Sequence, residues 1–555
     1  MLAGALLVVV AGVIMMTAGA WVVGATWDER THVLMLQTFL ERGWNVTPDA
    51  LLADGRPDPS YPFGTYVYGP VAELFAHFTN VSLGIEELGS PTYTALSTSG
   101  RHLGTALLGI VGIAATAGVV YLVTGSKRYA VIGAALLCST GMWVGHSMFN
   151  IKDLPVATGY TLGTLGVVAF AHPAFRSRHD LRWVGLGALT AGAVLASGTR
   201  PAMGAPLVAA AIGTPLVLAV LRSSLSGVQA VREFREALVR MAWAVASLAA
   251  AYVSLIAIYP NAYANPVNLA WQTLVVSARF PFNEQVLTAG TWMDQPPTWT
   301  YLPLWFGAQL PLLISVFFIL GLASWTLGIW RNLRGQISRD GSFQLAMIFA
   351  VLMQAALMPI LGIALQSTMY NGQRQFLFVL PAVVITATVG IRAGFKIIST
   401  RSRKSWLPLA YWVTISIGII GPTVGQALTF PYNYVYFNTA ASAFGINGNW
   451  PTDYWRASSN ELMRRLPAAG PEVCSYETDR SGQMSACSKE PMFIPYLDQR
   501  GDWATYRGTL GEGYWLVREN YGDLTVPNGC EPHAEVTRPL WGERIVISQI
   551  FRCSN

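Results

Sequence analysis

Four short polar segments separate long apolar stretches of the chain, and their side chains are of types that could act on a substrate. They cover residues 27–32, 150–155, 198–201 and 370–375. Their candidate functional groups are three acids and three cations: Asp28, Glu29, Asp153, Lys152, Arg200 and Arg374. A carboxylate can take the proton of an attacking hydroxyl, and cations can stabilise a departing phosphate. This set therefore suits group transfer from a phosphate-linked donor.

Each segment by itself also has a simpler interpretation. Asp28 and Glu29 could be solvated acids at a helix end, and Lys152-Asp153 could be a charge pair at a helix start, where the helix dipole favours an acid. Arg200 could extend to lipid headgroups, and Arg374 could anchor an interface. We predict that all of them share one depth at one membrane face. Ionisable groups near a membrane are usually functional, so this grouping favours a site.

The elements that must position these groups are membrane-spanning helices. Of the 555 residues, 52% are hydrophobic and 12% are charged, and the mean hydropathy is +0.40. A span needs about 20 mostly apolar residues. About eleven stretches qualify, at 3–24, 103–124, 129–147, 154–171, 183–198, 203–221, 241–259, 304–327, 344–365, 375–391 and 407–427. The predicted fold class is an all-α polytopic membrane protein with a small C-terminal α/β domain.

Loop charge predicts the orientation. Alternate loops are short and basic, carrying Lys127 and Arg128, Arg176 to Arg182, Arg222 to Arg240, Arg331 to Arg339, and Arg392 to Lys404. Short basic loops favour the cytoplasm. The N-terminus is then cytoplasmic, the catalytic membrane module covers 1–430 with outer loops 25–101 and 260–303, and residues 431–555 form an extracytoplasmic domain. A cleaved signal peptide ending near Val23-Gly24-Ala25 is an alternative for the first helix.

The cysteines agree with this layout. Cys138 falls inside a predicted helix, whereas Cys474, Cys487, Cys530 and Cys553 all fall in the segment placed outside. Four cysteines in an oxidising compartment indicate two disulfides, with three pairings open. A pair between Cys474 and Cys487 would close the shortest loop, and Cys530 with Cys553 would then tie down the chain end. A zinc site is the rival interpretation, although the spacings differ from those of structural fingers.

Several motifs resemble the GT-C superfamily of transferases that use polyprenyl-phosphate sugars, above all bacterial protein O-mannosyltransferases and aminoarabinose transferases (ArnT-like enzymes). Asp28-Glu29 resembles an acidic motif of the first outer loop, and residues 150–155 resemble a "KDxP" pattern of the second. The likeness continues, over roughly residues 20–460, through segments 295–303, 374–381, 431–438 and 453–455. Gln375 stands where one subgroup often has histidine, which puts a second cation there in doubt.

The resemblance implies an inverting sugar transfer to a hydroxyl of a cell-envelope glycan, a glycolipid or a protein. Asp28 would be the base with Glu29 as a helper, and Asp153 would orient the acceptor or hold a cationic partner. Lys152, Arg200 and Arg374 would bind the donor phosphate. Aromatic residues of the outer loops could contact the sugar or acceptor, or belong to the interfacial belt: Tyr66, Tyr68, Trp299, Tyr301 and Tyr370.

The remaining expectations concern partners and rival functions. No cofactor is expected with certainty, and a divalent metal ion stays open because some relatives use one. Membrane lipids are expected partners and nucleic acid is not, because topology accounts for the basic charge. Neither outer loop has a glycine-rich phosphate-binding motif, so nucleotide binding has no support. The alternative function is a flippase or transporter of lipid-linked sugars, and a third is a non-catalytic scaffold.

Overall fold

The chain was analysed as a computed structural model that describes residues 1–58, 68–223, 230–280, 282, 285–336, 338–401, 404–466, 473–478, 484–488, 514–519 and 525–554. Within these residues, ten helices are long and apolar enough to cross a membrane. They are α1 (Leu2–Val22), α4 (Ala95–Thr124), α7 (Asp153–Ala171), α8 (His179–Thr199), α9 (Gly204–Ser223), α10 (Ala230–Ile258), α14 (Leu312–Leu333), α15 (Arg339–Ala364), α16 (Val379–Arg401) and α17 (Leu407–Thr429). The chain is a multi-pass membrane protein, as predicted.

Two predicted spans are each divided between two helices. Span 304–327 covers the end of α13 (Thr298–Gln309) and most of α14, with a break at Leu310 and Pro311, and span 129–147 also consists of two helices. These are α5 (Lys127–Cys138) and α6 (Gly141–His146), with a break at Ser139 and Thr140. The hydroxyls of these two residues donate to the carbonyls of Leu136 and Leu137. Such local side-chain bonds compete with the helix ladder, and Gly141 follows them, so the apolar run is interrupted at this point.

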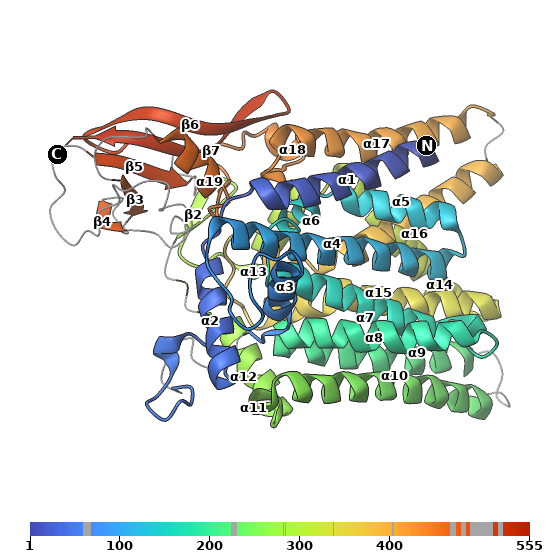
Figure 1. Cartoon of the computed structure of the whole chain (residues 1–555). Helices are drawn as coiled ribbons and strands as arrows, with labels where there is room; N and C mark the ends of the chain where they lie inside the picture. Colours follow the sequence, from blue (N-terminus) through green and yellow to red (C-terminus); the bar gives the residue numbers. More distant parts are fainter. Residues whose placement is uncertain are drawn as a thin grey trace.

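All these helices run roughly along one direction, and the two ends of the bundle differ (Figure 1). One end carries the N-terminus and the connections α4–α5 and α7–α8, which belong to the basic loops. The other end carries the C-terminal sheet, and we call it the sheet end. The basic connections thus share a side, as the loop charges predict. Which side faces the cytoplasm stays a prediction.

Helix α7 occupies the centre of the bundle and is almost entirely buried. It packs closely on α8 through glycines: a Cβ at Gly192 would lie 2.4 Å from the backbone nitrogen of Gly163, so no larger residue is accommodated without movement. Small residues at helix contacts are typical of membrane bundles, where close packing replaces the hydrophobic effect. This contact fixes the position of Asp153, the first residue of α7.

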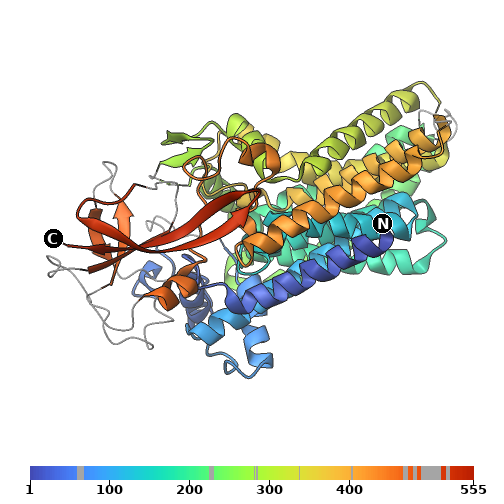
Figure 2. The same cartoon turned by 90° about the horizontal axis from the view of Figure 1, so that it is seen from above.

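Short elements cover the sheet end of the bundle and come from the two predicted outer loops. They are α2 (Glu29–Arg42), η1 (Pro48–Ala50), α3 (Val71–Ser82), α11 (Pro260–Tyr263), α12 (Pro266–Ala278), β1 (Val286–Thr288), β2 (Thr291–Met293) and α13 (Thr298–Gln309). The turns η2 (Pro173–Phe175), η3 (Pro201–Met203), η4 (Arg374–Phe376) and η5 (Asn433–Val435) join longer helices. Figure 2 shows the C-terminal domain beyond these elements, at the end of the bundle.

The C-terminal domain holds a five-stranded mixed sheet of order β4-β3-β5-β7-β6, with short helices α18 (Thr439–Ser442) and α19 (Ser459–Arg465) in the preceding segment. Its strands are β3 (Val473–Thr478), β4 (Met484–Ser488), β5 (Tyr514–Glu519), β6 (Cys530–Leu540) and β7 (Glu543–Cys553). Only β3 and β5 pair in parallel among the described strands. The α/β domain that the sequence predicts is therefore present, with the sheet as its main part.

A disulfide joins Cys530 to Cys553 and ties the start of β6 to the end of β7. This bond is one of those the cysteine pattern predicts. The side chains of Cys474 and Cys487 lie outside the described part of the structure, so their pairing stays a prediction. Cys138 is a buried free thiol, as expected for a cysteine inside a helix.

Candidate active site

The four polar segments that the sequence singles out meet at the sheet end of the bundle. The α1–α2 turn supplies Asp28, the start of α7 supplies Lys152 and Asp153, the α8–η3 junction supplies Arg200, and η4 supplies Arg374. We call these five side chains the charged cluster. The predicted grouping of four segments far apart in the sequence is thus present in the structure, and the chemical roles of the residues stay predictions.

Local hydrogen bonds fix the start of α7, where two cluster residues are neighbours. The side-chain oxygen of Asn150 accepts the backbone N–H of Asp153 at 2.9 Å and that of Lys152 at 3.3 Å. Its amide nitrogen donates to Asp153 Oδ2 at 3.0 Å. These bonds occupy backbone N–H groups that have no partner within the helix, and they hold the acid of Asp153 in one orientation.

Every charge in the cluster has a partner of opposite sign. Lys152 Nζ lies 2.6 Å from Asp28 Oδ2. Asp153 bridges two guanidinium groups, with Arg200 Nη2 at 2.5 Å from one oxygen and Arg374 Nη1 at 3.0 Å from the other. Hydrogen bonds between ionised groups are the strong ones, so the arrangement is well ordered before any substrate binds.

Exposure separates the cluster into reachable and enclosed groups. The Asp28 side chain is 30% exposed and that of Arg200 is 19% exposed, whereas Asp153 is 2% exposed. Lys152 and Arg374 are also buried. A substrate can therefore meet Asp28 and Arg200 directly, while Asp153 lies behind them and orients the arginines.

Electrostatics keep Asp28 and Lys152 ionised. Burial by itself would raise the pKa of Asp28, but nearby positive charge, above all that of Lys152, outweighs this effect and holds the pKa below its usual range. Burial would likewise lower the pKa of Lys152, and the charge of Asp28 more than compensates, leaving the pKa raised. Near neutral pH Asp28 is a carboxylate that can accept a proton.

Aromatic rings form the walls of the cluster. The Tyr68 ring lies 5.3 Å from Lys152 Nζ and 5.5 Å from the Arg200 guanidinium carbon. The Trp455 ring lies 5.1 Å from Lys152 Nζ and 3.8 Å from the Arg374 guanidinium carbon. Cations over aromatic faces are stabilised by the ring quadrupole. Trp455 was not among the predicted site residues, although the Asp453-Tyr454-Trp455 motif was the signal that could have found it.

The other predicted aromatic residues differ in where they lie. Tyr370 lies near the cluster, with its ring 5.1 Å from the Arg374 guanidinium carbon and stacked on Phe282 at 4.3 Å. Tyr301 is buried and donates to the carbonyl of Gly372 at 3.2 Å, so it supports the segment before Arg374. Trp299 is 67% exposed at the start of α13. Tyr66 lies outside the described residues.

Glu29 turns away from the charged cluster. Its side chain is buried and hydrogen-bonds to His102 of α4. Adjacent helix residues project in different directions, so Asp28 and Glu29 cannot both face one site. The structure therefore places the proposed helper in a separate contact between α2 and α4.

A metal site was left open by the sequence. Among the described residues, no three histidine, cysteine, aspartate or glutamate side chains are grouped so that they could hold a metal ion. In the charged cluster itself, each carboxylate is engaged by lysine or arginine. The residues present there do not fit a metal ion.

A largely apolar cavity lies beside the cluster, between η3, α12, α15 and the segment that follows Arg374. Arg200 is part of its wall, together with side chains such as Met203, Leu274, Met358, Leu361 and Phe376. Counted with its open mouth, its empty volume is about 700 Å³. Most of the wall is hydrocarbon, and Arg200 connects it to the charged cluster.

Comparison with known proteins gives matches among solved structures. No protein-family model matches the chain, and no curated protein matches it. Among solved structures, it is similar to ArnT from Cupriavidus metallidurans, in a crystal structure of the apo state and in one bound to undecaprenyl phosphate. Each match covers 98% of this chain and 97% of that chain, with a TM-score of 0.43 and 14% sequence identity. So distant a likeness says nothing of the donor, the acceptor or the roles of single residues.

Proposed function

We propose that this chain transfers a sugar from a polyprenyl-phosphate-linked donor to an acceptor hydroxyl at the extracytoplasmic face of the membrane. The observation that carries the proposal is the position of Arg200. This residue pairs with Asp153 inside the charged cluster and also lines the apolar cavity. An amphiphilic donor with an anionic head and a hydrocarbon tail matches this combination of surfaces.

The charge of the cluster supports a phosphodiester donor. Three cations, Lys152, Arg200 and Arg374, face two carboxylates, so the ionised cluster carries one net positive charge. A lipid-phosphate sugar carries a single negative charge and would neutralise it. Two of the cations are arginines, whose planar guanidinium groups suit phosphate oxygens. We expect the phosphate to lie against Arg200, the most exposed of the three.

The reaction would be a single displacement at the anomeric carbon. The acceptor oxygen attacks this carbon as its proton passes to Asp28, and the bond from the carbon to the phosphate oxygen breaks. The bonding electrons stay on the lipid phosphate, where Arg200 and Arg374 stabilise the added charge. Attack from the side opposite the phosphate inverts the anomeric configuration.

The division of roles within the cluster follows from exposure. Asp28 is reachable and ionised, which a general base requires. Asp153 is enclosed and holds two arginines, which suits it to orient the phosphate-binding groups rather than to meet the acceptor. Lys152 contributes both to proton transfer and to phosphate binding, because it contacts Asp28, the proposed base, and is itself a cation.

Release of lipid phosphate tests the proposal. The purified protein in detergent is incubated with polyprenyl-phosphate mannose and polyprenyl-phosphate arabinose, with a membrane extract as the acceptor source. We expect lipid phosphate to appear with one of these donors, and Asp28→Asn to abolish it. Asp54→Asn is the matched control, because Asp54 is an exposed acid of the same outer loop, paired only locally with Arg56.

A flippase would behave differently in the same experiment. It would move the intact donor across sealed vesicles and release no lipid phosphate in detergent. That result would overturn the proposed transfer, even if Asp28→Asn also stopped the movement.

A further inference from the structure

Three glutamate–histidine pairs lie at the sheet end among the described residues, and the transfer mechanism uses none of them. His32 pairs with Glu73 at 2.6 Å, His77 pairs with Glu86 at 2.7 Å, and His102 pairs with Glu29. All six side chains are buried. His32 and His77 differ in what else each contacts, and this difference indicates which of these two histidines has a chemical role.

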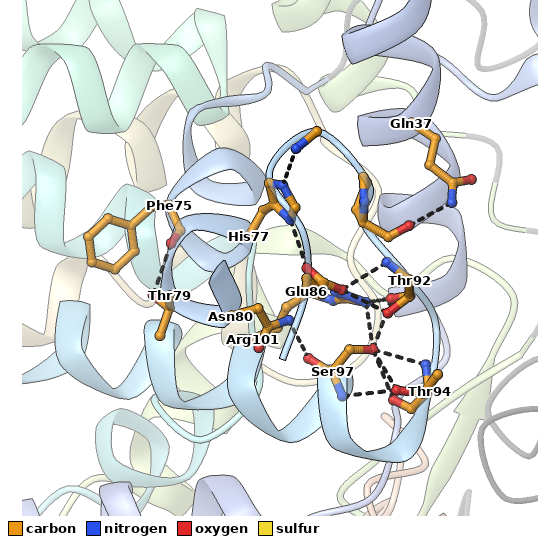
Figure 3. A network of polar contacts seen from close by, with 12 residues as sticks. Gln37, Phe75, His77, Thr79, Asn80, Glu86, Thr92, Thr94, Ser97 and Arg101 are labelled. Carbon is orange, nitrogen blue, oxygen red and sulfur yellow. Dashed lines mark hydrogen bonds and ion pairs between the residues drawn. The ribbon is translucent and has the colours of Figure 1, made fainter. Parts of the chain in front are cut away.

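The His77–Glu86 pair belongs to a network that fastens the loop between α3 and α4 (Figure 3). The second ring nitrogen of His77 accepts the backbone N–H of Gly89 at 3.2 Å, so both nitrogens are bonded. Glu86 also accepts from Arg101 at 2.8 Å and from the backbone of Thr92 at 2.8 Å. His77 thus fastens this loop to α3 through both of its ring nitrogens, which is a structural role.

His32 is placed differently, because it lies one helical turn after the candidate base. Its backbone N–H donates to the carbonyl of Asp28 at 3.1 Å. Side chains four residues apart project from the same face of a helix, so the imidazole neighbours the Asp28 carboxylate. Its ring also packs edge-on against Tyr68, with centroids 5.5 Å apart, and Tyr68 forms a wall of the charged cluster.

Glu73 fixes the orientation of this imidazole. Nδ1 of His32 is 2.6 Å from Glu73 Oε1, and among the described residues Nε2 has no hydrogen-bond partner. With Glu73 ionised, Nδ1 carries the proton and Nε2 is an acceptor. Burial raises the pKa of Glu73, although the bond to His32 opposes this effect, so the carboxylate is a stronger base toward the imidazole than an exposed glutamate is.

We propose that His32, held by Glu73, is the group that takes from Asp28 the proton that Asp28 has removed from the acceptor. The inference rests on the proposed sugar transfer and extends it by one proton step. His32 acts through Asp28 and does not touch the sugar, so it is a positioning residue with a proton-accepting role.

The proton balance of the complete reaction gives this step a purpose. Transfer converts a phosphodiester and a hydroxyl into a glycoside, a lipid phosphate and one proton. That proton first forms the neutral acid of Asp28, which cannot act again until it is ionised. Passage through one water to Nε2 forms an imidazolium that the Glu73 carboxylate stabilises at Nδ1–H. Loss of the proton from Nε2 to bulk water restores both groups.

The substitution of choice is His32→Asn. The side-chain amide nitrogen of asparagine can replace Nδ1 and keep the bond to Glu73, while the acceptor at Nε2 is lost. We expect turnover with the polyprenyl-phosphate sugar that the wild type consumes to fall about 100-fold, at the lower end of the range for a positioned acid–base group. The dissociation constant for undecaprenyl phosphate should stay within about twofold, because the phosphate-binding cations are unchanged.

His77→Asn is the matched control. It makes the same replacement in the loop network, also keeps the bond to the partner glutamate, and should leave turnover within about twofold. Equal losses of turnover in the two variants would mean that the effect of His32→Asn is structural, and would overturn the relay.

Chemical rescue separates a proton role from a packing role, even if His32→Asn folds poorly. Imidazole added to His32→Ala should restore turnover at least tenfold, and added to His77→Ala it should change nothing. Absence of rescue, or wild-type turnover in His32→Asn, overturns the relay while the sugar transfer stands. If the wild type releases no lipid phosphate from any donor, the proposed function falls and the relay falls with it.

Discussion

Lys152 Nζ lies 2.6 Å from Asp28 Oδ2, and this ion pair joins two residues that are 124 positions apart in the chain. Lys152 is buried, whereas Asp28 is partly open to solvent. The pair links the carboxylate proposed to accept a proton with a cation proposed to face the donor phosphate. Because one side chain serves both groups, changes at Lys152 should affect the pH dependence of the reaction as well as its rate.

Asp28→Asn tests the assignment of the base. Asparagine keeps the shape and can accept a hydrogen bond from Lys152, but it cannot take the acceptor proton. We expect kcat to fall about 10²–10⁴-fold, the usual contribution of a positioned base, while the affinity for undecaprenyl phosphate persists. Parallel measurements of turnover, binding and thermal unfolding distinguish this from misfolding. Near-normal turnover would place the base elsewhere, with Asp153 the first candidate.

Lys152→Met tests the electrostatic part of the pair. The charge of Lys152 lowers the pKa of Asp28 against the effect of burial, so its removal should raise that pKa. Asp28 must be ionised to act as the base, so activity is lost as the pH falls through the pKa of Asp28. In the variant this loss should occur at a higher pH. The acid limb of the plot of kcat against pH should therefore move to higher pH. An unchanged acid limb would mean that another group controls it.

The sequence predicted the meeting of the charged segments but not their pairing. Each segment adjoins a predicted helix end, and alternation of the helices places those ends at one face. Whether Lys152 pairs with Asp28 or with Asp153 depends on the rotation of α2 against α7, which loop lengths and apolar runs do not determine. For the same reason, the sequence could not decide that Asp28 faces the cluster while Glu29 turns toward His102.

Tertiary packing explains the other differences. The break between α5 and α6 follows from Ser139 and Thr140, two residues that a hydropathy pattern tolerates inside a span. Trp455 reaches the cluster from a segment beyond the last spanning helix, so only a motif could have indicated it. The side-chain environment of His32 depends on Glu73 of α3, a helix that is not one of the predicted spans.

The orientation of the bundle can be tested at exposed positions on its two ends. Ser177 belongs to the basic α7–α8 connection, and Phe444 is 85% exposed in the segment that leads to the sheet. In intact cells, an impermeant thiol reagent should label Phe444→Cys and should not label Ser177→Cys until the membrane is permeabilised. The unmodified chain gives the background from its own cysteines. The reverse pattern would place the charged cluster at the cytoplasmic face and remove the extracytoplasmic assignment.

Asp153 holds Arg200 and Arg374 together, and its contribution to stability can be measured. Asp153→Asn leaves two guanidinium groups without their counter-charge in an enclosed site, and breaking one side of a buried ion pair typically costs about 3–5 kcal/mol. We expect a clear fall in the unfolding temperature in detergent. Adding Arg374→Gln to Asp153→Asn removes one of the stranded charges, so the double variant should lose less stability than the two single variants combined.

The matched cycle uses Asp54 and Arg56, an ion pair whose members are 47% and 74% exposed on an outer loop. Solvent already screens that pair, so Asp54→Asn and Arg56→Gln should have small and additive effects on the unfolding temperature. Asp153 is enclosed and pairs with two arginines, and for this reason we assign the role of base to Asp28 instead. If the effects of Asp153→Asn and Arg374→Gln are also additive, the two side chains are not coupled. Asp153 would then be available to act on the acceptor itself.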